Sequence, residues 1–327
     1  MRFLFTLVVT IALGVLVAGY GWVHQRFEMP AATVELAIEP GWSARDVAHA
    51  VVQAGVPVHA GVLYAWFRMS GQSRNIRAGS YELTPDTTPR SLLRKLVRGE
   101  EALRAVTLVD GWTFRQIRQA LKAAEHLKPD SQSMPATALM AHLGKPGVAP
   151  EGRFFPDTYT YSKGSSDLAV LQRAMRAMDK HLVAAWDHRD PQTPLKTPEQ
   201  ALILASIIEK ETGLPSDRPT IAAVFSNRLR LGMRLQTDPT VIYGLGESFD
   251  GNLRKKDLLT DTPWNTYTRT GLPPTPISMP GKAALLAAVQ PGPSNALYFV
   301  ARGDGSSVFS TTLDAHNRAV NKYQRGQ

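Results

Sequence analysis

The first feature that limits the fold is an uninterrupted apolar run at the amino terminus. Residues 3–23 (FLFTLVVTIALGVLVAGYGWV) contain no charged side chain. As an α-helix this run would be about 31 Å long, which matches a hydrocarbon core of about 30 Å. The apolar region of a cleaved signal peptide is usually only about 7–15 residues long, and no small-residue cleavage site follows this run. We therefore expect a retained single-pass anchor, with a cleaved signal peptide as the alternative.

The residues beside this run bear on its orientation. Tyr20 and Trp22 suit an aromatic belt at the membrane interface. Arg2 stands on one side of the span and His24 and Arg26 stand on the other, so charge alone leaves the orientation open. A large domain after a very short tail favours a tail in the cytoplasm. In a bacterial cell, the rest of the chain would then face outward from the inner membrane.

The remaining residues have the composition of a globular protein. Of the 327 residues 43% are hydrophobic, which is enough to bury a sizeable core and predicts more than one. The absence of cysteine excludes disulfides, a cysteine nucleophile and any Cys-ligated metal. The formal net charge of +9 suits a membrane surface, an acidic polymer or nucleic acid. We expect no nucleic acid partner, because no recognised binding motif is present and an outside location argues against it.

Basic residues are concentrated between residues 68 and 122. This stretch holds 11 Lys and Arg against 5 Asp and Glu, so it carries +6 of the total charge. Such a surface suits anionic lipid headgroups or an anionic polymer. A solvated face without a partner is the alternative.

A short pattern occurs twice, seventy residues apart. Residues 41–47 (GWSARDV) and 111–117 (GWTFRQI) share the pattern G-W-[ST]-x-R-[DQ]-[VI]. Ser43 and Thr113 are good helix N-caps, and the Asp or Gln three residues later completes a capping box. Each copy also follows an alternating, strand-like run. Both segments therefore predict a strand, a turn and a capped helix.

Further signals divide the chain into four parts. Alternating runs predict strands at residues 33–38, 78–83 and 105–109, and a periodic run predicts a helix at residues 89–97. Residues 128–150 are rich in Pro, Gly and Ser and predict a linker. The expected parts are an anchor with its cytoplasmic tip (1–27), a region of two strand–helix modules (28–127), the linker (128–150) and a second domain (151–327).

In the second domain, a helix that is apolar on nearly every side ends in acidic residues. Residues 197–200 (TPEQ) form a strong helix start, and residues 201–208 (ALILASII) contain only one polar side chain. A helix that is apolar all round is buried, so Glu209 at its end is partly desolvated. Burial raises the pKa of a carboxyl and makes it a proton donor, as a glycosidic general acid requires. A structural carboxylate paired with Lys210 or an arginine is the alternative.

Three turn-rich segments follow, at residues 234–243, 264–268 and 271–277. They combine Asn, Thr, Gln and Tyr with aromatic side chains and proline. Sugar hydroxyls and acetamido groups need hydrogen bonds, and pyranose faces need flat apolar partners. These segments therefore suit a sugar cleft, although ordinary rigid loops have the same composition.

A set of longer motifs closely resembles the YceG-like family. The motifs are ASIIEKET (205–212), NRL (227–229), MRLQTDPTVIYG (233–244), NTY (265–267), GLPP (271–274) and HN (316–317), together with EGRFFPDTY (151–159). The resemblance covers nearly the whole chain, including the anchor. It implies an α+β fold with one amino-terminal transmembrane helix, a small LysM-like strand and helix subdomain, and a larger mixed α/β catalytic domain.

The resemblance also implies an activity and its partners. It implies an endolytic lytic transglycosylase that cleaves the bond between N-acetylmuramic acid and N-acetylglucosamine in nascent peptidoglycan strands. The products would carry 1,6-anhydromuramyl ends, and the cut would end strand elongation beside peptidoglycan synthases. No metal or cofactor is implied.

Other functions remain open at this stage. The alternatives are a hydrolytic muramidase with the same acid and a non-catalytic, membrane-tethered glycan-binding protein. A metal or serine hydrolase is poorly supported, because the sequence has no H-E-x-x-H, no G-x-S-x-G and no S-x-x-K motif.

The resemblance assigns roles to particular residues. It maps the catalytic acid onto Glu209, the first glutamate of the E-K-E-T element, with Glu211 as a structural partner of the acid. The acid would protonate the leaving oxygen and then, as a carboxylate, take the proton of the muramyl 6-hydroxyl. The expected substrate-positioning residues are Gln236, Asp238, Asn265, Tyr267 and Glu151.

Overall fold

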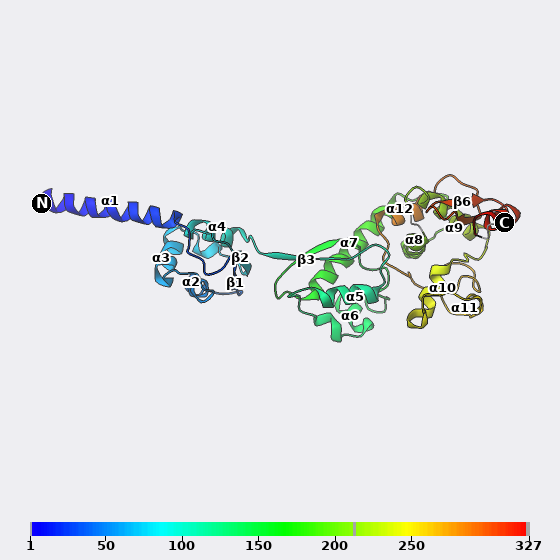
Figure 1. Cartoon of the computed structure of the whole chain (residues 1–327), viewed down its shortest axis with the longest axis horizontal. Helices are drawn as coiled ribbons and strands as arrows, with labels where there is room; N and C mark the ends of the chain where they lie inside the picture. The colour runs from blue at the N-terminus through cyan, green and yellow to red at the C-terminus, as the bar shows by residue number, and fades with distance from the viewer. Residues whose placement is uncertain (1, 212–213, 325–327) are drawn as a thin grey trace. The chain divides into compact units, whose positions relative to one another are not determined.

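The computed structural model describes residues 2–211 and 214–324. The chain forms two compact units (Figure 1). Unit 1 comprises Met1–Arg104 and Thr160–Ser165, and unit 2 comprises Ala105–Tyr159 and Ser166–Gln327. Both helices and strands occur along the described chain, which confirms the mixed class that the sequence predicts.

Unit 1 combines helices with a two-stranded antiparallel sheet. Its elements are α1 (Arg2–His24), β1 (Val34–Ile38), α2 (Ala44–Gln53), α3 (Ala60–Met69), the 3₁₀ turn η1 (Ser73–Asn75), β2 (Gly79–Leu83) and α4 (Pro89–Arg98). Strands β1 and β2 pair from Val34 opposite Leu83 to Ile38 opposite Gly79. Alternate residues of β1 are buried, so one face of this sheet closes the core of the unit.

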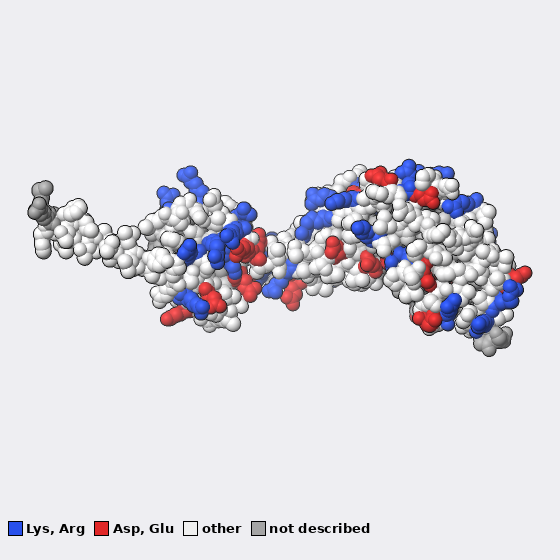
Figure 2. All heavy atoms as spheres, turned by 90° about the horizontal axis from the view of Figure 1, so that it is seen from above, with Lys and Arg blue, Asp and Glu red and all other residues white. Residues whose placement is uncertain are grey.

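Helix α1 is apolar and exposed. Its candidate span, Phe5–His24, has a mean hydropathy of 2.0, and Figure 2 shows no charged side chain along it. Among the described side chains of α1, only those at its carboxyl end pack against the unit, where Val23 is buried and α1 contacts α4. By length and composition α1 is able to cross a membrane, as the sequence predicts, and an amino-terminal signal sequence has the same properties.

The two copies of the G-W pattern fold alike. Ser43 begins α2 and Thr113 begins α5 (Phe114–Ala123), and each residue forms the predicted capping box. Gly41 and Gly111 both have positive φ angles, of 88° and 76°, which favour glycine in the turn before the cap. The sequence prediction of a turn followed by a capped helix is confirmed in both copies.

Unit 2 is mainly helical. After β3 (Leu103–Thr107) and α5 come η2 (Asp130–Ser133), α6 (Ala136–His142), β4 (Thr158–Ser162), α7 (Asp167–Asp187), α8 (Pro198–Glu211), α9 (Arg218–Arg230), α10 (Asp238–Leu245), η3 (Gly246–Ser248), α11 (Lys255–Leu259), α12 (Lys282–Val289), β5 (Tyr298–Ala301), β6 (Ser307–Ser310) and α13 (Leu313–Gln324). Strand β3 pairs with β4, and β5 pairs with β6 in an antiparallel hairpin. Strands β3 and β4 each contain residues of both units, because the chain divides after Arg104 and again after Tyr159.

Helix α8 is the centre of unit 2. All residues from Ala201 to Ile208 are buried, as their sequence predicts. Helices α7, α9, α10 and α12 all contact α8 and supply its apolar neighbours. The buried Ser206 also ties a loop to the helix, because its hydroxyl accepts a hydrogen bond from the backbone N–H of Ile277 at 3.0 Å. The buried run of α8 is therefore packed on every side up to Ile208.

Residues 105–150 are grouped with unit 2, whereas the sequence suggests a separate module and a linker. The reason is a set of buried contacts. Leu139 and Met140 of α6 are fully buried, and the buried Asp167 at the start of α7 accepts hydrogen bonds from the backbone N–H and the hydroxyl of Ser131, at 2.9 and 2.6 Å. Although its Pro, Gly and Ser content is typical of a linker, this stretch packs against the rest of unit 2.

The central position of α8 gives a test of the fold. We expect Leu204→Ala to lower the free energy of unfolding by about 2–5 kcal/mol, because it opens a cavity in a filled core. Leu231→Ala is the matched control, since Leu231 is 63% exposed and we expect a change of less than about 0.5 kcal/mol. Chemical denaturation of both variants measures the difference. Equal effects would contradict the central role of α8.

Candidate functional site

Two carboxyl groups leave the end of α8 in different directions. Glu209 and Glu211 are two residues apart, so their side chains point about 200° from each other around the helix axis. Both side chains are half-buried rather than free in solvent. The same buried helix therefore carries two carboxyls into two different environments.

Glu211 borders a cavity of about 570 Å³ in unit 2. Its side-chain lining brings together residues from α8, α9, the loop before α10, the β5 strand and α13. The lining residues are Glu211, Arg228, Leu235, Gln236, Asp238, Tyr267, Tyr298, Phe299, Val300, Ala301, Leu313, His316, Asn317, Val320 and Gln324. The cavity has the size of a small-molecule or sugar-binding site and combines aromatic rings with polar groups.

Burial makes Glu211 a proton donor near neutral pH. Desolvation raises the pKa of this carboxyl from 4.5 to about 7, and the negative charge of Asp238 adds to that rise. A hydrogen bond from the hydroxyl of Thr237 and the positive charge of Arg228 act in the opposite direction. The balance leaves a substantial fraction of the Glu211 carboxyl protonated at pH 7.

The loop from Leu235 to Asp238 presents its polar side chains to this cavity. Thr237 is buried and lies outside the lining, whereas the exposed Gln236 and Asp238, with the buried Leu235, line the cavity. Gln236 has a φ angle of 51°, a left-handed conformation that non-glycine residues rarely adopt. Such strain occurs where the surrounding structure fixes a side chain in a required position. Asp238 is held as well, because it accepts a hydrogen bond from the hydroxyl of Tyr267 at 2.6 Å.

Arg228 lines the cavity and also holds other lining segments in place. Its guanidinium group donates hydrogen bonds to the backbone carbonyls of Leu235 and Leu297, each at 2.7 Å. It also lies over the ring of Tyr298, 5.1 Å from the ring centre. Because the Arg228 side chain is buried, these contacts join α9, the loop before α10 and the β5 strand in one arrangement.

Glu209 lies on another side of α8. One of its carboxylate oxygens accepts a hydrogen bond from the backbone N–H of Gly281 at 2.9 Å, and the other lies 4.0 Å from the guanidinium of Arg218. Burial raises the pKa of Glu209, and the nearby charge of Asp110 raises it further. The side chain is 10% exposed and is not among the residues that line the Glu211 cavity.

Asn265 supports the cavity without bordering it. The residue is fully buried, and its amide nitrogen donates to the carbonyls of Leu258 and Thr260 at 3.1 and 2.7 Å. Its amide oxygen accepts a hydrogen bond from the backbone N–H of Tyr267 at 2.8 Å. Asn265 therefore positions Tyr267 and the turn around it.

Glu151 is also buried away from this cavity. Its carboxylate accepts hydrogen bonds from the backbone N–H of Phe114 at 2.9 Å and from the hydroxyl of Tyr243 at 3.2 Å. Burial raises the pKa of Glu151 to about 7 despite these bonds. Its position at the start of α5 indicates that it joins α5 to α10.

The structure thus brings together some of the residues that the sequence indicates. Gln236, Asp238 and Tyr267 meet at one cavity, while Glu209, Asn265 and Glu151 lie outside its lining. Glu211 lies in the same lining, which also contains four residues that the sequence did not indicate as substrate contacts: Arg228, Tyr298, His316 and Asn317. The H-N pair at residues 316–317 was visible as a motif, but nothing in the sequence showed that α13 contacts β5 and lines the same cavity as Arg228 of α9. Within the described ranges, no group of three His, Asp or Glu side chains is arranged to hold a metal ion.

Comparison with known proteins gives a consistent family relationship. A model of the YceG-like family matches residues 36–322. The chain is 32% identical to the endolytic murein transglycosylase of Bacillus subtilis strain 168, over 89% of this chain and 85% of that protein. It is 26% identical to a Streptococcus pneumoniae protein of the same name over 88% of this chain, and it spans 58% of that relative. A crystal structure of a yceG-like protein from Listeria monocytogenes is 31% identical, has a TM-score of 0.58 and covers 88% of this chain and 98% of its own.

The buried carboxyl of Glu151 predicts a pH dependence of stability. Its pKa is higher in the folded chain than in the unfolded chain, so folding binds a proton between about pH 4.5 and 7. Stability from this group is present at low pH and is lost as the pH rises. We expect the wild type to lose about 3 kcal/mol of unfolding free energy relative to Glu151→Gln between pH 4 and 8. Chemical denaturation across this range measures it, and parallel pH profiles would refute it.

Proposed function

The chain belongs to the YceG-like family, and we propose that it is an endolytic murein transglycosylase of the lytic type. The family match over residues 36–322 and the names of its relatives support this assignment. The proposed substrate is the glycan strand of peptidoglycan. The proposed products are 1,6-anhydromuramyl ends, formed without water by cleavage between N-acetylmuramic acid and N-acetylglucosamine.

The observation that carries this proposal is a protonatable carboxyl in a polar, aromatic cavity. Glu211 has a raised pKa of about 7 and borders the same cavity as Gln236, Asp238 and Tyr267. A general acid must reach the glycosidic oxygen and must be protonated before the bond breaks. Tyr267 would supply a flat face for a sugar ring, and Gln236 and Asn317 would supply hydrogen-bonding groups for hydroxyl and acetamido substituents.

We assign the acid to Glu211, although the sequence resemblance favours Glu209. The support for Glu211 is its place among the residues that line the cavity, where the Thr237 hydroxyl donates a hydrogen bond to its carboxyl. Glu209 lies outside that lining, accepts the Gly281 N–H and lies 4.0 Å from Arg218. The arrangement of Glu209 suits a carboxyl that joins α8 to the start of α12. The assignment of the acid to Glu209 stays a prediction. One pair of variants, at Glu209 and at Glu211, tests the two assignments against each other.

A single carboxyl is able to serve both steps of the reaction. Protonated Glu211 gives its proton to the leaving oxygen as the glycosidic bond breaks. The substrate's own acetamido group stabilises the positive charge that develops at the anomeric carbon. Glu211, now a carboxylate, takes the proton of the muramyl 6-hydroxyl as that oxygen attacks the same carbon. The 1,6-anhydro ring closes and the carboxyl of Glu211 is protonated again.

Helix α1 is the basis for the proposed location of the protein in the cell. We propose that α1 is a single-pass anchor and that the units after it face outward from the cytoplasmic membrane of a bacterium. Exposure of its apolar side chains supports this, since a helix with no protein partner along most of its length needs another apolar environment. Within unit 1, the compact core around β1, α2, α3 and β2 is the candidate for the LysM-like subdomain. The anchored enzyme would cut nascent strands near the synthases that make them and end their elongation.

The two glutamates give the decisive pair of variants. We expect Glu211→Gln to lower the rate of glycan cleavage by at least about 10²–10⁴-fold, because the amide gives up no proton. We expect Glu209→Gln to retain the rate within about tenfold, because on this proposal Glu209 serves only to join α8 to the start of α12 through the Gly281 N–H. Mass spectrometry of products from purified glycan strands measures both. If Glu209→Gln is inactive and Glu211→Gln is active, Glu209 is the general acid and the assignment to Glu211 is wrong.

The same product analysis separates the alternative functions. A lytic transglycosylase leaves anhydromuramyl ends, which are one water lighter than reducing ends. Reducing ends from the wild type would make the protein a hydrolytic muramidase. Strands that bind to the wild type but remain intact would make it a tethered glycan-binding protein.

The pKa of Glu211 predicts the alkaline limb of the pH profile. The acid works only while it is protonated, so the cleavage rate should fall about tenfold per pH unit above about pH 7. Initial rates between pH 5 and 9 measure this limb. A rate that stays constant up to pH 9 would show that no group with this pKa acts as the acid.

A further inference from the structure

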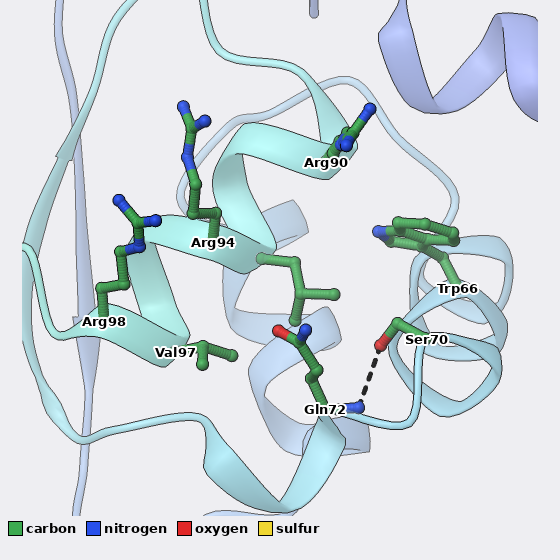
Figure 3. Close-up of a pocket in the computed structure, with 8 residues that line it drawn as sticks. Trp66, Ser70, Gln72, Arg90, Arg94, Val97 and Arg98 are labelled. Atoms are coloured by element: carbon green, nitrogen blue, oxygen red, sulfur yellow. Dashed lines mark hydrogen bonds between the residues drawn. The ribbon is translucent and has the colours of Figure 1, made fainter.

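A second large cavity lies in unit 1, far in sequence from the catalytic residues. It has a volume of about 610 Å³. Its lining comes from α3, the turn before η1 and α4, as Figure 3 shows. The lining residues are Trp66, Ser70, Gln72, Arg90, Leu93, Arg94, Val97 and Arg98. Three of these eight side chains are arginines, and none of the eight is acidic.

The three arginines form a row along α4. Arg90, Arg94 and Arg98 are spaced four residues apart, so they lie on one side of the helix over about 12 Å. All three are exposed, and Figure 3 shows their side chains extending from the same side of α4. The opposite side of α4 is buried in the core through Leu92 and Leu96. We call these three residues the arginine row.

Little on the protein neutralises the charge of this row. Arg98 lies 3.7 Å from Glu100, and both side chains of that pair are well exposed. Arg94 has no ion pair within residues 2–211 and 214–324. The basic neighbour on α4, Lys95, points elsewhere and donates to the backbone carbonyl of Glu82 at 2.5 Å. The arginine row therefore presents net positive charge to solvent.

The row begins where α1 ends. A guanidinium nitrogen of Arg90 lies 2.8 Å from the ring nitrogen Nε2 of His24, the last residue of α1. The backbone N–H of Phe27 also donates to the carbonyl of Thr87, next to the start of α4, at 2.9 Å. These contacts fix the start of α4 beside the end of the apolar helix. The Trp66 ring lies beside Arg90 in the same cavity, and its indole N–H donates to the carbonyl of Pro89 at 3.2 Å.

We propose that the arginine row binds the phosphate groups of anionic phospholipid headgroups in the membrane that α1 spans. This proposal rests on the anchor proposed for α1. Guanidinium groups bind phosphate oxygens through paired hydrogen bonds, and tryptophan is enriched at the depth of the headgroups. Because Arg90 touches the last residue of α1, the row starts at the membrane surface, where lipid phosphates are the concentrated anions. Binding there would hold unit 1 against the bilayer.

The test measures lipid preference in the full chain. The protein in nonionic detergent is titrated with phosphatidylglycerol, with phosphatidylcholine or with inorganic phosphate, and native mass spectrometry counts the bound molecules. We expect the wild type to bind phosphatidylglycerol more tightly than phosphatidylcholine. Arg94→Gln/Arg98→Gln should weaken phosphatidylglycerol binding about 30-fold, since each basic side chain near anionic lipid contributes about fivefold.

A matched variant controls for net charge. Arg68→Gln/Arg74→Gln removes two exposed positive charges from the same unit but none from the cavity. We expect it to bind phosphatidylglycerol like the wild type. The proposal is overturned if both double variants lose affinity equally, or if the wild type binds the two lipids alike. Tight binding of inorganic phosphate that displaces the lipid would instead assign the row to a soluble phosphate compound.

A separate measurement tests the anchor. Full-length chain in vesicles is washed with alkaline carbonate, and the fraction that stays with the lipid is measured for the wild type and both double variants. Release of all three would refute the anchor, whatever the lipid preference in detergent. Retention of all three, with loss of phosphatidylglycerol preference only in Arg94→Gln/Arg98→Gln, would support the anchor and the arginine row together.

Discussion

The burial of α8 on every side is the constraint on which unit 2 depends. Ala201 to Ile208 have no solvent-facing side, so helices α7, α9, α10 and α12 must surround them. Ser206 adds a polar tie, because its hydroxyl and carbonyl bind the backbone of Ile277 and the side chain of Ser278. A helix held in this way delivers the groups at its end to fixed positions, which a catalytic acid requires.

Features set within one helical turn or one strand could be predicted from the sequence. The capping boxes at Ser43 and Thr113 depend on residues three apart, and both form. The start of α8 and its buried run also follow from local pattern, and the strand predicted at residues 33–38 matches β1 within one residue. Each of these signals is carried by neighbouring residues alone. The motifs at residues 233–244 and 265–267 indicated Gln236, Asp238 and Tyr267 through the family resemblance, and these three residues line one cavity.

Features set by contacts between distant segments could not be predicted. Residues 128–150 resemble a linker in composition, but the bonds between Ser131 and Asp167 cross 36 residues and fix their path. Arg228 belongs to the NRL motif, but its role depends on the distant carbonyls of Leu235 and Leu297, which that motif does not show. Glu209 as the acid stays a prediction, and the pattern E-K-E alone did not show that Glu211 lies among the residues that line the cavity.

Three carboxyls of unit 2 show why a raised pKa does not by itself identify a catalytic acid. Burial raises the pKa of Glu151, Glu209 and Glu211 alike. Glu151 has both oxygens bound by protein donors, and Glu209 is bound by a backbone N–H beside an arginine. Glu211 alone of these three borders the cavity that holds Gln236 and Asp238. Desolvation raises the proton affinity in all three cases, so a raised pKa does not choose among them, and the proposal of Glu211 over Glu209 depends on the lining of the cavity.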